Sequence, residues 1–243
     1  NVWCAAGKGT FGTDELVSRI RVTALADFVS LKNLILPILG APGVAAHEVA
    51  RQTGFTVRYA AIRAADLPEY LDNGMVTTPA MRQMTFSFYE RLVLVPVELV
   101  TALQTTLTIA ICFYLIGALL GAIEIGFKAA MAYIGAVIAG VVVGPLLLPW
   151  LPGRSFAIKG ALTGLVWAGL WYLLSGRGEL EMSALIGSVL ALPAISAYYM
   201  LNFTGCTPYT SRTGVKLEMR RALPAMACAL LAGATILAVA MFL

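Results

Sequence analysis

The residues best suited to chemistry lie in the first thirteen positions, where one cysteine stands among small residues. Cys4 is followed by Gly7, Gly9 and Gly12, which are three glycines within six residues. Glycines let a backbone approach a large flat ligand closely, and a cysteine offers such a ligand a soft, polarisable donor atom. The segment therefore predicts a loop that binds a flat cofactor and presents one sulfur atom to it.

Three other interpretations of this segment lead to different chemistry. A Walker loop requires Ser or Thr after its Gly-Lys pair, but Gly9 follows Lys8 here, so that motif fails. A dinucleotide-binding G-x-G-x-x-G loop does match residues 7–12, although no apolar strand precedes it in this sequence. A cysteine nucleophile would need a base, and His47 is the one histidine. The last two interpretations stay open beside cofactor binding.

The other cysteines do not form a metal-binding pattern. No C-x-x-C pair occurs, so we expect no zinc site and no iron–sulfur cluster within this chain. Cys112 and Cys228 lie in apolar stretches, where we expect small buried hydrophobic side chains. Cys206 lies in a predicted loop and has no predicted function.

The composition separates a half of ordinary globular character from a half suited to lipid. The 243 residues are 59% hydrophobic and 12% charged, whereas a soluble domain carries about 25% charged residues. Residues 1–96 hold nine of the 17 Lys and Arg and eight of the 13 Asp and Glu. Residues 97–243 supply most of the net charge of +4, so this charge indicates membrane topology and not nucleic-acid binding.

The globular half predicts alternating helices and strands. Helices are expected at 13–29, 44–53 and 66–72, and buried parallel strands at 34–39 and 55–60. The hydroxyl of Thr13 is expected to cap the first helix. The turn Gly40–Gly43 follows the first strand, and α/β layers bind ligands at the carboxyl ends of their strands. Because so few strands form a poor core alone, we expect further chain before Asn1 to complete the sheet.

The apolar half predicts five membrane spans of about 20 residues, the length that a bilayer core requires. They are expected at 98–122, 128–150, 157–175, 182–204 and 222–243. The loops 151–160 and 205–221 carry six Lys and Arg, against two in the opposite loops. This bias predicts that those loops and the globular half lie in the cytoplasm. Small residues at four-residue spacing, such as Gly160 and Gly164, predict close helix packing more than a substrate path.

Residues 1–13 resemble the cap-helix signature of the mercury-methylating corrinoid proteins. Further phrases similar to this family stand at 39–48, 63–68, 78–82 and 202–205. A corrinoid domain followed by five membrane helices is also the arrangement of that family. The globular half is more distantly similar to the corrinoid iron–sulfur methyl carrier of the acetyl-CoA pathway, which lacks the cysteine at this place and has no such membrane domain.

The resemblance implies an α/β fold class, with a partial Rossmann-like corrinoid-binding domain at 1–96. An all-α membrane domain of five transmembrane helices would follow at 97–243. The cofactor would be a cobamide (a corrinoid of vitamin B12 type), with the Cys4 thiolate as the lower axial ligand of its cobalt. The implied cofactor-binding residues are Asn1, Val2, Trp3, Cys4, Ala5, Ala6, Gly7, Lys8, Gly9, Thr10, Gly12, Gly40, Ala41, Pro42 and Gly43.

The implied activity is methyl transfer from a methyltetrahydrofolate-type donor to cobalt, and then from methyl-cobalt(III) to Hg(II), giving methylmercury. Hg(II) is a soft electrophile, so it needs the methyl group as a carbanion or radical equivalent. A thiolate below the cobalt donates electron density and favours that outcome. A small ferredoxin with [4Fe–4S] clusters would supply electrons, and the protein would be a multi-pass protein of the cytoplasmic membrane, in contact with lipid and not with nucleic acid.

Two other function classes remain open on the residues alone. One is a corrinoid methyl carrier of acetyl-CoA-pathway type, or a methyltransferase of the same architecture, that serves a different methyl acceptor. The other is a membrane protein without enzymatic activity, such as a transporter with a regulatory ligand domain. The methyl-carrier class predicts that replacing Cys4 leaves activity largely intact. The transporter class predicts that no cobamide is bound.

Overall fold

A computed structural model describes residue 6 and residues 10–175, 182–207 and 210–240. They divide into two compact units, unit 1 (Asn1–Thr85) and unit 2 (Phe86–Leu243). Helix α6 (Phe88–Leu119) begins directly after this boundary, where the Ser87 side chain accepts a hydrogen bond from the Glu90 N–H and Glu90 caps in return. The boundary predicted after residue 96 therefore falls inside a helix.

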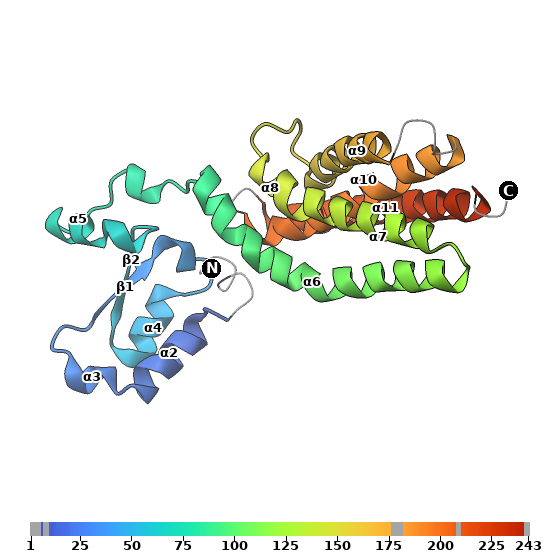
Figure 1. The fold of residues 1–243 in the computed structure, drawn as a ribbon. Coiled ribbons are helices and arrows are strands. Elements are labelled where there is room, and N and C mark those ends of the chain that lie inside the picture. Colours follow the sequence, from blue (N-terminus) through green and yellow to red (C-terminus); the bar gives the residue numbers. More distant parts are fainter. Residues whose placement is uncertain (1–5, 7–9, 176–181, 208–209, 241–243) are drawn as a thin grey trace. The chain divides into compact units, whose positions relative to one another are not determined.

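Unit 1 is a small α/β layer (Figure 1). Its elements are α2 (Thr13–Val22), α3 (Leu25–Phe28), β1 (Asn33–Pro37), η1 (Ile38–Gly40), α4 (Ala46–Thr53), β2 (Thr56–Ala60), η2 (Ala64–Asp66), α5 (Leu67–Asp72) and η3 (Ala80–Arg82). Strands β1 and β2 pair in parallel, with Leu34 opposite Val57. The main core joins α2 and α4 to the sheet through Val17, Ile20, Leu36, Val44, Val49, Phe55 and Val57. The predicted alternation of helices and parallel strands is thus present.

The details of unit 1 differ from the prediction in two places. The helix predicted at 13–29 is interrupted at Ala24, whose backbone is left-handed (φ 49°), so that α2 and α3 are separate. Strand β1 was expected to be buried on both faces, yet Leu36 is buried while the Ile35 side chain is 37% exposed. In the described part of unit 1 the sheet has two strands, which is a smaller layer than a Rossmann-like domain.

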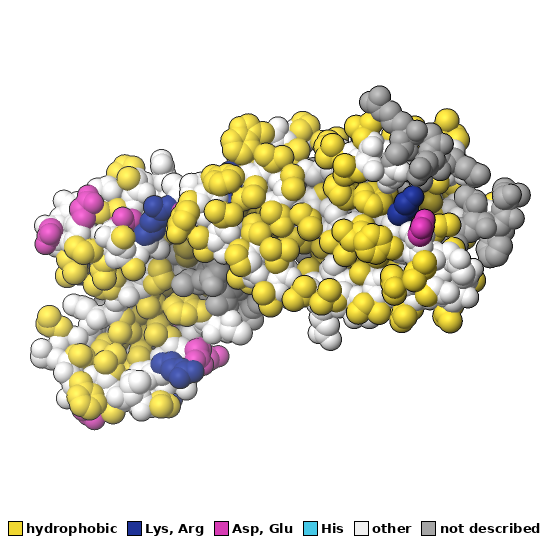
Figure 2. Space-filling view, viewed as in Figure 1, with side chains coloured by type: hydrophobic (Ala, Val, Ile, Leu, Met, Phe, Trp, Pro, Cys, Tyr) yellow, Lys and Arg dark blue, Asp and Glu magenta, His cyan; other side chains and the backbone are white. Residues whose placement is uncertain are grey.

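Unit 2 is helical. Its elements are α6, α7 (Ile123–Ile138), the π-helix η4 (Ala139–Val143), α8 (Gly144–Leu146), α9 (Phe156–Leu174), α10 (Met182–Asn202), η5 (Phe203–Cys206) and α11 (Arg212–Ala240). Five helical stretches among the described residues are long and apolar enough to cross a membrane, in agreement with the five predicted spans. Figure 2 shows that hydrophobic side chains cover most of the visible face of this unit. These features indicate a multi-pass membrane protein.

The small residues predicted to pack helices do so. A Cβ atom added to Gly160 would lie 2.7 Å from the Ala197 Cα of α10, and one added to Gly164 would lie 2.6 Å from the Pro193 Cα. Gly117 and Gly126 bring α6 and α7 together in the same way. Backbone approach through small side chains is the usual basis of helix association in lipid. The packing interpretation is therefore confirmed for Gly117, Gly160 and Gly164, whereas Gly121, which follows Gly117 at the same spacing, lies after the end of α6 and faces open space.

Two glycines of α9 give a test of this packing. Gly160→Ala should destabilise unit 2 by about 1–3 kcal/mol, because its methyl group would strike the α10 backbone. Gly169→Ala should be neutral or stabilising by up to about 1 kcal/mol, since a Cβ there meets open space and alanine favours a helix. Thermal unfolding of the 243-residue chain in detergent micelles would compare them, and equal effects would contradict the tight α9–α10 contact.

The two cysteines of the spans were predicted wrongly. Cys112 on α6 and Cys228 on α11 are both exposed on their helices instead of buried. The predicted cytoplasmic loops also differ, because Lys159 lies in the first turn of α9. Its side chain is buried, and its Nζ donates to the Leu148 carbonyl oxygen at 2.7 Å. The Lys159 side chain thus connects the start of α9 to the segment after α8, in addition to any role in membrane topology.

Several helices of unit 2 begin or finish at the same end of the helix bundle. The apolar cluster there contains Phe86, Leu148, Phe156, Met200 and Phe203. Arg91 is buried beside it, donates to the Phe86 carbonyl oxygen at 2.6 Å and lies 5.9 Å from the ring centres of Phe86, Phe88 and Trp150. Cationic side chains of α6, α9 and the preceding loop therefore share one end of the bundle.

Candidate functional site

Two segments singled out in the sequence meet beyond the carboxyl end of β1. The Thr13 N–H donates to the Gly43 carbonyl oxygen at 3.1 Å. In return the Ala45 N–H donates to the Thr13 Oγ1 at 2.9 Å. The start of α2 is thereby fixed to the turn that leads into α4. The capping role predicted for Thr13 is wrong, because Gly12 occupies the N-cap position and the Thr13 hydroxyl serves this tertiary contact.

The glycines of the turn allow this close approach. A Cβ atom on Gly43 would lie 2.9 Å from the Ala6 Cα and still closer to the Phe11 carbonyl oxygen. A Cβ atom on Gly40 would lie 2.7 Å from the Phe11 ring. Both glycines are therefore needed for contact within the protein, and not only for access by a ligand.

The structure brings several predicted cofactor-binding residues into one neighbourhood. Gly12, Gly40 and Gly43 lie at the junction of the two segments, together with Ala6. Thr10, Ala41 and Pro42 are exposed beside it and present their surfaces to solvent. The remaining predicted residues lie outside the part of the chain that the structure describes, and they are Asn1, Val2, Trp3, Cys4, Ala5, Gly7, Lys8 and Gly9.

Tyr59 supports the junction from strand β2. Its hydroxyl donates to the carbonyl oxygen of Val44, the residue that follows Gly43. Sequence reasoning missed both this tyrosine and Phe11. The available signal was the alternation along β2, which places Tyr59 on the same side of the strand as the buried Val57.

Burial raises the pKa of Tyr59 above its ordinary value of about 10. The folded state therefore favours the neutral phenol. Its contribution to stability should be complete below the unfolded pKa and should disappear as the pH rises through the folded pKa. Carbon-13 NMR titration of tyrosine-labelled protein should show that the phenol signal missing from Tyr59→Phe ionises above the ordinary range in the wild-type protein. Ionisation of this signal at or below its ordinary value would contradict the burial of the hydroxyl.

The alternative base, His47, is exposed on the first turn of α4. The neighbouring Glu48 carboxylate accepts hydrogen bonds from Gln52 and Arg51, and these bonds lower its pKa. Glu48 is thus engaged along its own helix. The relation of His47 to Cys4 lies outside the described residues, so a cysteine–histidine pair stays an untested alternative.

No group of three His, Cys, Asp or Glu side chains in the described ranges could hold a metal ion.

The geometry therefore defines a candidate site without assigning it to a family. Two glycine-containing segments are bonded together beyond the end of a parallel strand, with Tyr59 behind them. No family model matches this chain, and no curated protein or solved structure matches it either.

Proposed function

We propose that this protein is a corrinoid-dependent methyltransferase that transfers a methyl group to Hg(II). The observation that carries the proposal is the junction of residues 10–13 with the turn 40–45, beyond the carboxyl end of β1. Ligands of open α/β sheets bind at this edge. Both segments contain residues that the resemblance implies to be cofactor-binding, among them Thr10, Gly12, Gly40 and Gly43.

The proposed sulfur donor is close to the junction in the sequence. Cys4 precedes Ala6 by two residues, and two residues reach about 7 Å at most. Ala6 lies against Gly43, since a Cβ atom there would be 2.9 Å from the Ala6 Cα. We therefore propose that the Cys4 sulfur acts at this junction, where Thr10, Ala41 and Pro42 border the bound group.

The cofactor and the residues of the chain would have separate roles. A bound cobamide would supply the cobalt-centred methyl chemistry. The Cys4 Sγ would lose its proton and hold the cobalt as a soft donor, since thiolates and not thiols are metal ligands. Thr13 and Tyr59 would hold the turn in place through the Gly43, Ala45 and Val44 backbone.

The orientation in the membrane is part of the proposal. The cationic side chains at one end of unit 2 include Arg91, Arg154 and Lys159. An excess of Lys and Arg marks the cytoplasmic side, so we propose that this end faces the cytoplasm and that the protein spans the cytoplasmic (inner) membrane. A ferredoxin with [4Fe–4S] clusters and a methyltetrahydrofolate-type donor would be reached there.

The test is methylmercury formation from Hg(II) in anoxic cells that lack this activity. The cells would carry the complete gene with its ferredoxin partner, and the cobamide content of the purified protein would be measured in parallel. Methylmercury together with bound cobamide is the expected result. Bound cobamide without methylmercury would favour the methyl carrier with another acceptor, and the absence of cobamide would favour the non-enzymatic membrane protein.

A further inference from the structure

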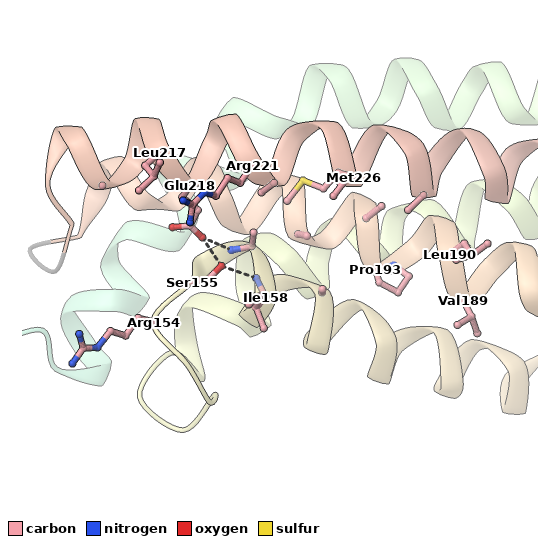
Figure 3. Close-up of a pocket in the computed structure, with 18 residues that line it drawn as sticks. Arg154, Ser155, Ile158, Val189, Leu190, Pro193, Leu217, Glu218, Arg221 and Met226 are labelled. Atoms are coloured by element: carbon pink, nitrogen blue, oxygen red, sulfur yellow. Dashed lines mark hydrogen bonds between the residues drawn. The ribbon is translucent and has the colours of Figure 1, made fainter.

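An open, mostly apolar groove runs along unit 2 between α9, α10 and α11, with a volume of about 730 Å³ (Figure 3). Helix α10 packs against both neighbours and forms its floor through Pro193 and Ala194. Small side chains of α11, such as Ala225, form one wall. The groove lies on helices that are apolar enough to cross a membrane, so its occupant has to be compatible with hydrocarbon.

The polar groups of the groove are gathered at one end. Figure 3 shows Arg154, Glu218 and Arg221 at that end, whereas Val189 and Leu190 lie farther along the helices. It is the end at which α9 and α11 begin, and where we propose the cytoplasmic face. The groove is therefore amphipathic along its length, with a charged mouth and an apolar body.

The mouth carries the two guanidinium groups of Arg154 and Arg221 and the one carboxylate of Glu218, so its formal charge is +1. The Glu218 Oε1 accepts from the Ser155 hydroxyl at 2.8 Å and from the Ala157 N–H at 2.9 Å. The carboxylate thus satisfies the N-terminus of α9, where the helix dipole favours a negative charge. Neither Arg154 nor Arg221 takes part in the ion pairs Arg19–Glu15 and Arg51–Glu48 of the described residues.

We propose that this groove binds an anionic phospholipid, with its phosphate at Arg221, further positive charge from Arg154 at the same end, and an acyl chain along α10. Guanidinium groups bind phosphate through paired, charge-assisted hydrogen bonds. From Gly214 to Ala229 the lining of α11 covers 15 residue steps, or about 22 Å of helix, which is most of a hydrocarbon core of about 30 Å. Basic pockets between membrane helices are suited to such head groups.

A second copy of this chain fits the groove less well. A symmetric dimer through the groove would bring Arg154 and Arg221 of both copies together at its mouth, and like charges repel. A lipid brings the complementary negative charge instead. The proposal concerns unit 2 alone, so it stands or falls independently of the corrinoid chemistry.

The test adds phosphatidylglycerol or phosphatidylcholine to the delipidated 243-residue chain in neutral detergent. Bound lipid is measured by native mass spectrometry, and the melting temperature by thermal unfolding. Phosphatidylglycerol should bind and raise the melting temperature, whereas phosphatidylcholine should do neither. The double variant Arg154→Gln/Arg221→Gln should bind phosphatidylglycerol about tenfold more weakly. The matched control Lys216→Gln/Arg220→Gln removes the same charge from α11 residues that do not line the groove, and it should lose much less.

A second pair of variants tests the apolar body. Ala225→Phe should block the groove and reduce phosphatidylglycerol binding, whereas Ala227→Phe adds the same bulk to an exposed position outside the lining. Equal losses in both charge variants would overturn the proposal, since general attraction to the surface would then explain the binding. Wild-type binding by Ala225→Phe would overturn it too, as would a lipid-independent dimer that Ala225→Phe abolishes.

Discussion

Cys4→Ala should reduce methylmercury formation to the level of cells without the gene, while the protein level stays the same. The variant removes the one sulfur donor that the sequence places within two residues of the junction at Ala6. A methyl side chain cannot coordinate a metal, so the proposed electron donation to a bound cobalt would be lost. The measurement is methylmercury per unit of protein after exposure of anoxic cells to Hg(II).

The chain provides matched controls for this substitution. Cys112→Ala and Cys228→Ala make the same change at exposed positions of α6 and α11, and both should retain wild-type activity. The visible absorption spectrum of the purified protein gives a second readout, because loss of a thiolate ligand changes the spectrum of a bound cobamide. Full activity of Cys4→Ala would remove the sulfur from the mechanism and favour the methyl carrier with another acceptor.

Gly43→Ala should separate the two halves of the candidate site and abolish cobamide binding. The added methyl group would collide with the backbone at Phe11 and Ala6, and backbone cannot move aside as a flexible side chain can. Relief requires that the Thr13 contact with the turn opens, which would lose two hydrogen bonds of about 1 kcal/mol each. The measurement is cobamide content after purification, with melting temperature as the second readout.

Gly40 gives a contrasting case in the same turn. Its added methyl group would meet the ring of Phe11, which is a side chain, so Gly40→Ala should retain part of the binding. Combining it with Phe11→Leu should restore more, because the smaller side chain leaves room for the methyl group. Ala41→Ser, at an exposed position, should have little effect. Wild-type binding by Gly43→Ala would show that the junction does not support the cofactor.

The sequence by itself determined the order of the elements and the membrane spans. Hydropathy summed over about 20 residues depends on local composition alone, so five stretches were evident before any contact was known. The apolar runs that became β1 and β2, and the left-handed Gly54 that ends α4, are also local features. The carboxyl end of β1 could be located for the same reason.

The tertiary structure decided which residues meet. The bond between Ala45 and Thr13 joins positions 32 residues apart, and no local pattern reports it, so Thr13 was expected only to cap a helix. The contributions of Phe11 and Tyr59 depend on the same long-range contact. The edge of the sheet was thus predictable, whereas the side chains that hold its two segments together were not.

The same distinction holds within the membrane helices. Cys112 and Cys228 were expected inside the bundle but are exposed, because a helix in lipid is apolar on every face and its sequence does not mark the side that meets a neighbour. Lys159 shows the converse. It was expected in a loop, but its side chain is buried and its Nζ donates a hydrogen bond to the Leu148 carbonyl oxygen. Composition therefore determined that these segments are long and apolar enough to cross a membrane. The packing of glycines against facing backbones decided how the helices are rotated and where a groove remains between them.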